Sequence, residues 1–374
     1  MTPEESNGSS QDASADPRSG DDGVNGANGA ARPLVERFDV ALLDLDGVVY
    51  VGTDPVPGVA DAITAVRRRG MRVTFVTNNA SRSPADVAKL LGSVGVDAVA
   101  ADVVTAAQAG ARVLAERIPR GAAVLIVGGD ALRDEVEAFG LTPVHSADDH
   151  PAGVIQGYHP SVGYRDLAEA TVAVRAGAVW IVTNGDLTIP SARGILPGNG
   201  ALVQVVRTAT GTPPVVTGKP EPALHQESVR RSGARRPIVV GDRLDTDIEG
   251  AARAGCPSLL VLSGVTTPSE LLAADAGHRP TYLAENVSGL LHAHRHPDRR
   301  DGGWRLCGWF AAEEDDALTL SWHGTAAQPD RLDALRVLCA ASWTTGSADG
   351  RGGVRVRASG DDATAATESL QLRS

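Results

Sequence analysis

The feature that most limits how this chain can fold is the alternation of short apolar runs with helical patterns along residues 38–291. The apolar runs predict strands at 40–43, 73–76, 122–127, 154–158, 179–182, 215–216, 237–240, 258–262 and 281–283. The stretches between them repeat apolar residues every three or four positions and predict helices at 57–70, 83–95, 105–117, 131–139, 164–176, 198–210, 222–232 and 248–254. Strands that alternate with helices form right-handed β–α–β units, so the sequence predicts an α/β fold with a Rossmann-like, mainly parallel sheet.

Two aspartates follow the first predicted strand. The apolar run Val40–Leu43 stops at Asp44, and Asp46 and Gly47 come next. Aspartates at positions i and i+2 of an extended backbone point the same way, and a parallel sheet presents them at the crevice beyond the carboxyl ends of its strands. On this stretch alone two interpretations stand side by side: a reactive, metal-binding pair, or a helix cap and turn.

Polar residues follow three further predicted strands. They are Thr77-Asn78-Asn79, then Lys219, then Asp242, and each motif alone also fits a loop or turn. In a parallel sheet they converge on the edge that carries the two aspartates. Carboxylates, a lysine and hydroxyl and amide groups are what phosphoryl transfer requires, because catalysis there depends on positioning and charge neutralisation. Hard oxygen ligands of this kind suit Mg²⁺.

These motifs, in this order, resemble those of the haloacid dehalogenase (HAD) superfamily. The resemblance covers roughly residues 38–291 and rests on Asp-Leu-Asp-Gly, Thr-Asn-Asn, Gly-Lys-Pro and Gly-Asp-x-x-x-x-Asp. More narrowly, V-T-N-N-A-S-R-S, T-N-G-D-x-x-x-P and G-K-P-E-P are similar to the nitrophenylphosphatase-like (NagD-like, subclass IIA) branch. An actinobacterial-looking composition and an extra C-terminal segment suggest the glycerol 3-phosphate phosphatases of that branch.

The resemblance implies a Mg²⁺-dependent phosphatase that works through an aspartyl-phosphate intermediate. Asp44 would be the nucleophile, and Asp46 would be the general acid and base, with its main-chain carbonyl on the metal. Lys219 would neutralise the nucleophile and the phosphate together. Asp242 would complete the metal site with the first two aspartates, and Asp247 would lie behind them and orient water or the lysine.

The resemblance also assigns the phosphate-binding groups. Thr77 and Asn78 would hydrogen-bond to phosphoryl oxygens. Asn79 would either join them or serve as a turn residue. Asp245 has no counterpart in the motif and is interpreted as a spare surface charge.

The spacing of the motifs predicts a lid over the site. Residues 80–218 separate Asn79 from Lys219 and contain β–α units of their own, which is the arrangement the family calls a C2 cap. The predicted domains are a catalytic core at 34–115 and 218–291 and a cap at 116–217. Within the cap, Asn184 and Asp186 would either contact substrate hydroxyl groups or cap their own loop. His159 is a weaker candidate, with an ordinary surface histidine as the alternative.

The composition changes beyond the core. Residues 292–301 carry three histidines and are interpreted as a solvated polar linker, with metal binding as the minor alternative. Residues 302–374 hold four of the five tryptophans and predict an accessory α+β module, with strands at 304–310, 318–322 and 354–357 and a helix at 329–343. Its pattern faintly resembles an acyltransferase fold but lacks the R/Q-x-x-G-x-G/A pyrophosphate loop. An interaction or dimerisation module is therefore the favoured interpretation, and a bifunctional protein is the alternative.

Several functional classes are excluded by composition and charge. The formal net charge of −11 argues against nucleic acid or an anionic membrane as a partner. No apolar run approaches the ~20 residues that span a bilayer, no signal peptide is visible, and residues 1–33 predict a disordered tail. Three widely spaced cysteines fit neither a disulfide framework nor a metal site.

The sequence therefore predicts a cytoplasmic enzyme whose partner is a small phosphorylated metabolite, and whether it forms a homo-oligomer is left open. The best guess for the substrate is glycerol 3-phosphate. Phosphoglycolate, a sugar phosphate, and transfer of the phosphoryl group to an acceptor alcohol are the alternatives.

Overall fold

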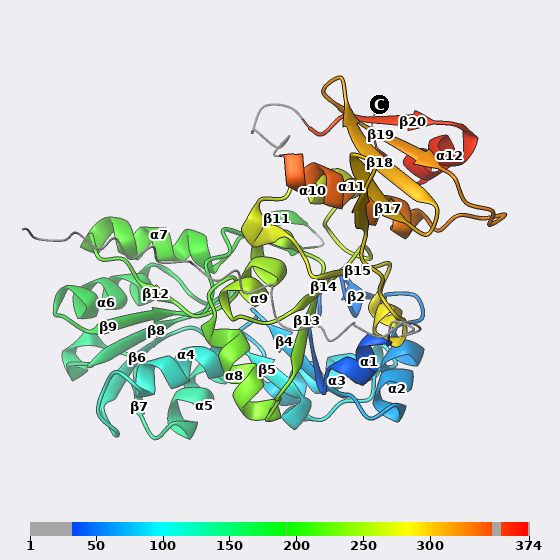
Figure 1. Ribbon diagram of the computed structural model, residues 1–374. Coiled ribbons are helices and arrows are strands. Elements are labelled where there is room, and N and C mark those ends of the chain that lie inside the picture. The colour runs from blue at the N-terminus through cyan, green and yellow to red at the C-terminus, as the bar shows by residue number, and fades with distance from the viewer. Residues whose placement is uncertain (1–31, 192, 346–352, 373–374) are drawn as a thin grey trace, which may run out of the picture. The chain divides into compact units, whose positions relative to one another are not determined.

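The computed structural model describes residues 32–191, 193–345 and 353–372 (Figure 1). The predicted disordered tail, residues 1–33, lies outside the described residues except for its last two positions. Of these, Pro33 forms a β-bridge with Ala293. Within the described part of the chain, no helix combines the length and the apolar character needed to cross a membrane.

Six parallel strands form the first sheet, in the order β15-β14-β13-β1-β4-β5 (Figure 1). Their bounds are Val40–Leu43 (β1), Arg72–Thr77 (β4), Val103–Thr105 (β5), Pro237–Gly241 (β13), Ser258–Val261 (β14) and Tyr282–Ala284 (β15). The predicted mainly parallel α/β fold is confirmed. A short antiparallel hairpin, β2 (Tyr50–Val51) and β3 (Asp54–Pro55), follows β1.

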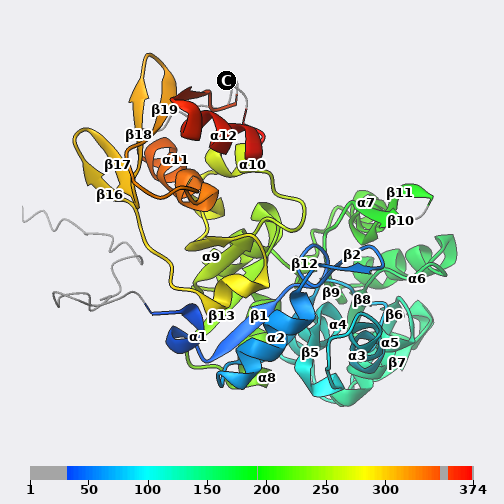
Figure 2. The ribbon, with the colours of Figure 1, turned by 90° about the vertical axis from the view of Figure 1, so that its right-hand side faces the viewer.

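Helices cover both faces of this sheet, which explains why its strands read as continuous apolar runs. Ala41 and Leu43 of β1 pack on one side, and Val40 and Leu42 pack on the other. The first side is covered by α1 (Leu34–Arg37), α2 (Val59–Arg68), α3 (Pro84–Ser93) and η5 (Val287–Leu291) (Figure 2). The second is covered by α4 (Ala106–Ala115), α8 (Ala223–Ser232) and α9 (Glu249–Arg253).

A second parallel sheet lies between the two halves of the first in sequence, in the order β12-β9-β8-β6-β7. Its strands are β6 (Ala123–Val127), β7 (Thr142–Val144), β8 (Gly153–Gln156), β9 (Val179–Val182) and β12 (Val215–Val216). Helices α4 and α5 (Asp130–Ala138) pack on one face, and α6 (Tyr164–Arg175) and α7 (Asn199–Thr210) on the other. The hairpin of β10 (Thr188–Ser191) and β11 (Gly194–Pro197) leads into α7. All of these strands fall within the segment predicted as a cap.

The last part of the chain forms a third, mixed sheet, β16-β17-β18-β19-β20. Its strands are β16 (Asp298–Arg300), β17 (Gly303–Leu306), β18 (Trp309–Glu314), β19 (Ala317–Trp322) and β20 (Val356–Ser359), and its helices are α11 (Arg331–Thr345) and α12 (Asp361–Ser369). Only the β19–β20 pair is parallel. The predicted additional C-terminal α+β module is therefore present.

Two predictions for this segment differ from the structure. The single strand expected at 304–310 is a hairpin, because Cys307 and Gly308 both adopt positive φ angles and turn the chain between β17 and β18. The segment 292–301, predicted as a solvated linker, contains strand β16. It also contains His294, which is buried and hydrogen-bonded to the carbonyl of Gly289 at 2.9 Å.

A shared apolar cluster joins α11 to the core. It includes the buried core-side residues Ile248, Leu260, Leu271, Leu272 and Leu283. Two hydrogen bonds accompany the packing: the Ser342 hydroxyl donates to the carbonyl of Leu272 (2.8 Å), and the Trp343 indole donates to that of Leu271 (3.1 Å). Leu271 and Leu272 belong to α10 (Pro268–Leu272), so the C-terminal module covers apolar surface of the part of the chain that forms the first sheet.

We expect Leu335→Ala in α11 to destabilise the protein by about 2–5 kcal/mol, because Leu335 is fully buried in this cluster and its loss leaves a cavity. The check is the midpoint of the first unfolding transition in denaturant. Val172→Ala is the matched control, since Val172 is 58% exposed on α6 and should change stability by less than about 0.5 kcal/mol. Equal midpoints for the two variants would contradict the packing described.

Candidate active site

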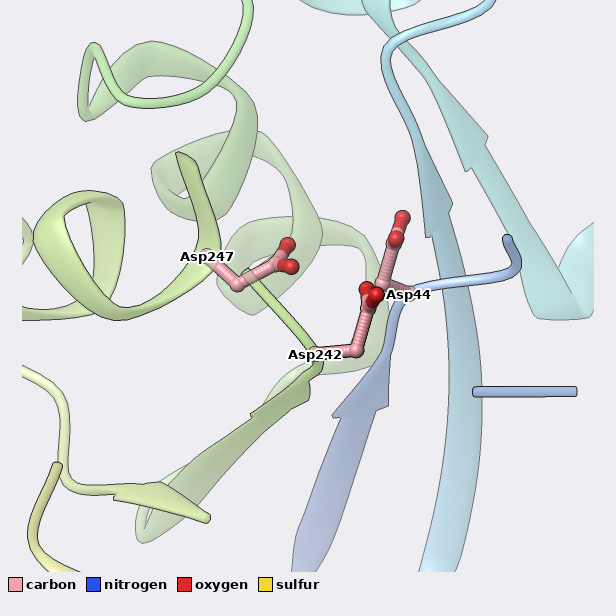
Figure 3. A group of neighbouring side chains, drawn as sticks. All are labelled: Asp44, Asp242 and Asp247. Carbon is pink, nitrogen blue, oxygen red and sulfur yellow. The ribbon is translucent and has the colours of Figure 1, made fainter. Parts of the chain in front are cut away.

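Three carboxylates converge at the carboxyl edge of the first sheet. Asp44 follows β1, Asp242 follows β13, and Asp247 belongs to the π-helical turn η3 (Leu244–Ile248) (Figure 3). One oxygen from each lies within 4.8 Å of the others. The sequence predicted that Asp44 and Asp242 would meet. Asp247, which was predicted to stand behind them, joins the same cluster.

Lys219 lies between two of these carboxylates. Its Nζ is 2.5 Å from Oδ1 of Asp44 and 2.7 Å from Oδ1 of Asp247. The side chains of Lys219 and Asp247 are 3% and 1% exposed, whereas that of Asp44 is 15% exposed. Asp44 is therefore the member of this ion-paired trio that a substrate can reach.

The site carries more negative than positive charge. Burial raises the pKa of Asp44 to about 8, with Asp247 and Asp242 acting in the same direction against Lys219. Burial, reinforced by Asp247, also raises the pKa of Asp242 to about 6. Burial alone would lower the pKa of Lys219, but the two carboxylates outweigh it, so its pKa lies above the ordinary value. One protonated lysine faces three carboxylates.

The donor set fits a divalent cation. The main-chain N–H of Val265 donates to Oδ2 of Asp242 at 2.7 Å. Oδ1 of the same carboxylate is buried and accepts no hydrogen bond from any described residue. An unpaired buried carboxylate oxygen beside two further carboxylates is suited to a hard cation such as Mg²⁺. Gly47 has a φ of +79°, and a Cβ there would lie 2.2 Å from Asp242 Oδ2, so the site requires glycine at this position.

Asp46 lies beside the cluster without joining it. Its side chain is exposed, yet desolvation by the surrounding protein raises its pKa, with Lys219 and Arg82 opposing the shift. Tyr50, which the sequence analysis did not select, is buried close enough for Asp46 and Asp44 to raise its pKa further than burial already does. A carboxylic acid with a raised pKa next to a nucleophile is placed to exchange protons with a leaving group.

The predicted phosphate-binding residues have other contacts. The side-chain amide of Asn78 is engaged by the main chain of Lys219: its Oδ1 accepts from Lys219 N at 2.8 Å, and its Nδ2 donates to Lys219 O at 3.1 Å. The Thr77 hydroxyl accepts from Asn79 N at 3.1 Å. Asn79 Oδ1 accepts from the N–H and the hydroxyl of Ser81, so Asn79 adopts the turn role that the sequence left open.

The residues predicted to lie in the cap also differ in what they contact. Asn184 is 5% exposed and hydrogen-bonded within the protein. Asp186 is half-buried, and burial raises its pKa against the opposing charges of Arg243 and Lys219 and a hydrogen bond with Asn78. His159 bonds to the Ser161 hydroxyl at 2.6 Å, as expected for a locally satisfied histidine. Asp245 is exposed and pairs with Arg243 at 2.8 Å.

The choice of lysine at position 219 is a signal that the sequence analysis did not use. The chain has two lysines, Lys89 and Lys219, and its other basic side chains, apart from the histidines, are arginines. A compact ammonium fits between two carboxylates in a buried position where a planar guanidinium would need more room.

We expect Mg²⁺ to stabilise the folded protein more at pH 8 than at pH 5. Because the pKa of Asp242 is raised from 3.8 to about 6, the folded state holds a proton at pH 5 that the unfolded chain has released. Without metal, this group's contribution to stability is therefore lost as pH rises from about 3.8 through 6. A divalent cation competes with that proton, so its effect should grow over the same interval. The measurement is the shift of Tm on adding Mg²⁺, and an equal shift at both pH values would contradict the expectation.

Family models match three segments of the chain. The model described as haloacid dehalogenase-like hydrolase matches residues 41–142, and a second, HAD-hydrolase-like model matches residues 216–290. A model described as a GCN5-related N-acetyltransferase like domain matches residues 307–372. The two hydrolase segments contain every residue of the acidic cluster and Lys219.

Two curated phosphatases are similar to this chain. The D-glycerol 3-phosphate phosphatase of Mycobacterium tuberculosis is 43% identical over 328 residues, which cover 85% of this chain and 89% of that protein. The acid sugar phosphatase of Staphylococcus saprophyticus is 37% identical over 259 residues, which cover 69% of this chain and 98% of that protein. About two thirds of this chain thus align with almost the whole length of the second protein.

Solved structures lead to the same family. A crystal structure of glycerol phosphate phosphatase from Mycobacterium tuberculosis in complex with magnesium is 42% identical, with a TM-score of 0.82 over 91% of this chain and 99% of that one. The 4-nitrophenylphosphatase of Thermotoga maritima is 29% identical, with a TM-score of 0.63 over 69% and 98%. The chain therefore belongs to the haloacid dehalogenase-like hydrolases, in their nitrophenylphosphatase-like branch, as its motifs predicted.

Proposed function

We propose that this protein is a Mg²⁺-dependent phosphatase that hydrolyses glycerol 3-phosphate through an aspartyl-phosphate intermediate. The observation that carries the proposal is the position of Asp44: it is the most exposed member of a buried acidic cluster, and Lys219 is in direct contact with it. The similarity to the glycerol 3-phosphate phosphatase of Mycobacterium tuberculosis, along 85% of this chain, supports this choice of substrate.

In the first step a carboxylate oxygen of Asp44 attacks phosphorus, and the bond between phosphorus and the glycerol oxygen breaks. Asp46 gives its proton to that oxygen, so glycerol leaves as a neutral alcohol. In the second step Asp46 takes a proton from water, the water oxygen attacks phosphorus, and the bond to Asp44 breaks. Lys219 stays protonated and offsets the charge on Asp44 and on the phosphoryl oxygens throughout.

Asp44, Asp242 and the main chain of Asp46 would hold Mg²⁺, and the position of Asp247 makes it a further candidate. The cation would supply positive charge against the phosphoryl oxygens when bound. Asp186, whose pKa responds to the charge of Lys219, is the cap side chain that we propose to meet a substrate hydroxyl group. Three cysteines without disulfide bonds fit a cytoplasmic enzyme.

For the C-terminal module we propose a structural role rather than acetyl transfer. The family match at residues 307–372 favours the acyltransferase-like fold. However, the loop between β19 and α11 runs H-G-T-A-A-Q-P-D and does not contain the R/Q-x-x-G-x-G/A pattern whose main-chain N–H groups would hold a pyrophosphate. The packing of α11 on Leu271 and Leu272 supports the structural role.

Phosphate release from a panel of phosphate esters tests the proposal. The panel holds glycerol 3-phosphate, phosphoglycolate, a hexose phosphate, a nucleotide and 4-nitrophenyl phosphate, each with and without Mg²⁺. We expect glycerol 3-phosphate to have the highest kcat/KM and chelation of the metal to abolish turnover. A preference for phosphoglycolate or a sugar phosphate would show that this compound, and not glycerol 3-phosphate, is the substrate. If an added alcohol becomes phosphorylated, the enzyme transfers the phosphoryl group to an acceptor and the proposal of hydrolysis is wrong.

A further inference from the structure

Side-chain amides from the cap and the core form one continuous hydrogen-bonded chain that ends at Lys219. Asn199, the first residue of α7, donates from Nδ2 to the carbonyl of Asn184 (2.8 Å). Asn184 donates from Nδ2 to the carbonyl of Asn78 (2.8 Å). The amide of Asn78 then accepts from Lys219 N (2.8 Å) and donates to Lys219 O (3.1 Å). We call Asn199, Asn184 and Asn78 the amide chain.

The side-chain N–H groups of these three amides donate within the protein, whereas Oδ1 of Asn199 accepts no hydrogen bond from any described residue. Asn184 is 5% exposed and Asn199 is 1% exposed. The Oδ1 of Asn184 accepts from Asp186 N at 3.3 Å while its Nδ2 is held by Asn78. Both heteroatoms of Asn184 thus have protein partners, so neither is left to bind a substrate hydroxyl group.

The main chain around Lys219 has little freedom once the amide chain is in place. A Cβ at Gly218 would lie 2.3 Å from the carbonyl of Thr183 and 2.7 Å from Oδ1 of Asn78, so the segment packs directly against both. The Nζ of Lys219 must reach Asp44 and Asp247 at the same time. Holding the backbone N–H and carbonyl of the same residue fixes where that side chain starts.

We propose that Asn184 is a positioning residue, which acts through Asn78 to hold Lys219 against Asp44. The inference rests on the proposed phosphatase function and deepens it. It replaces the alternative in which Asn184 binds a substrate hydroxyl group. Because the amide chain starts in the cap and ends at the catalytic lysine, it also makes the lysine's position depend on the cap loop at residues 183–186.

Steady-state kinetics of Asn184→Ala on two substrates test the proposal. Glycerol 3-phosphate has hydroxyl groups on its leaving alcohol, and 4-nitrophenyl phosphate has none. A misplaced Lys219 should lower kcat on both substrates by the same factor, about 10- to 100-fold, with KM within about two-fold of wild type. A substrate contact would instead raise KM for glycerol 3-phosphate and leave 4-nitrophenyl phosphate unaffected, which would overturn the proposal.

A mutant cycle tests whether Asn184 acts through Asn78. If it does, Asn78→Ala combined with Asn184→Ala should lose no more kcat than Asn78→Ala alone, because both changes break one chain. If the losses of kcat in the two single variants multiply in the double variant, Asn184 does not act through Asn78. Asn199→Ala, one hydrogen bond further away, should show the same pattern with a smaller loss, and it serves if Asn184→Ala does not fold.

Asn286→Ala is the matched control. The Oδ1 of Asn286 accepts from Ser288 N at 2.9 Å at the start of η5, outside the site, so this variant also loses a side-chain to main-chain bond. We expect it to shift Tm without changing kcat. A wild-type protein inactive on the whole panel would refute the proposed function, whereas an active wild type with an unaffected Asn184→Ala variant would refute only this inference.

Discussion

Asp44→Asn should reduce phosphate release by at least about 10⁴-fold, to the detection limit of the assay. The amide keeps the shape of the side chain but cannot form the aspartyl-phosphate. Uncatalysed hydrolysis of phosphate monoesters is so slow that enzymes accelerate it by up to ~10²¹-fold. Loss of the nucleophile should therefore remove turnover rather than weaken it. The measurement is phosphate release from glycerol 3-phosphate with Mg²⁺ at the pH optimum of the wild type.

The stability of the Asp44→Asn variant separates a chemical loss from a folding defect. Burial raises the pKa of Asp44 to about 8, which means that its charged form destabilises the fold at neutral pH in the absence of metal. A neutral amide should therefore leave the metal-free Tm unchanged or raise it. Asp245→Asn is the control, since Asp245 is exposed and pairs with Arg243 at the surface, and it should retain full activity. Turnover by Asp44→Asn above the background of a mock purification would exclude Asp44 as the nucleophile.

The strand ends of the catalytic half could be predicted from the sequence because a physical rule connects them. Asp44, Thr77 and Asp242 each follow an apolar run, and in a parallel sheet the carboxyl ends of all strands meet at one edge. The rule does not account for Lys219, because this residue follows β12, which pairs with β9 in the second sheet, and it reaches the edge of the first sheet from there. Local patterns therefore sufficed for the fold class and for most of the acidic cluster.

The hydrogen-bond partners could not be predicted, because they depend on distances between segments that no local pattern encodes. Asn78 was assigned to the phosphate by motif, but its side-chain amide is hydrogen-bonded to the main chain of Lys219, 141 positions later in the sequence. Nothing in the sequence marks Asn199 as a functional residue apart from its position at the start of a predicted helix. The family resemblance placed Asp247 behind the metal site, where it would orient water or the lysine. Asp247 does contact Lys219, at 2.7 Å, and the π-helical turn η3 also brings it into the acidic cluster.

Lys219→Met should lower kcat by about 10²–10³-fold, the loss expected when one preorganised charge is removed from a transition state. Methionine has similar length and an apolar end, so it fills the buried position without neutralising Asp44 or Asp247. The two carboxylates would then face each other without a cation between them. The free energy of unfolding should fall in metal-free buffer at pH 8, and the deficit should shrink at pH 5, where protons replace the missing charge.

Added Mg²⁺ should also recover part of this stability, but not the activity, because the cation neutralises the carboxylates without replacing the ammonium that contacts Asp44. Lys89→Met is the control within the same chain. Lys89 is 78% exposed and pairs with Asp86 on α3, so this variant should change neither kcat nor Tm measurably. Lys219→Arg should not restore activity, since the guanidinium must fit a site that leaves the lysine 3% exposed. A Lys219→Met enzyme with wild-type kcat would show that charge at this position is structural, and catalysis would then have to rest on the carboxylates and the metal.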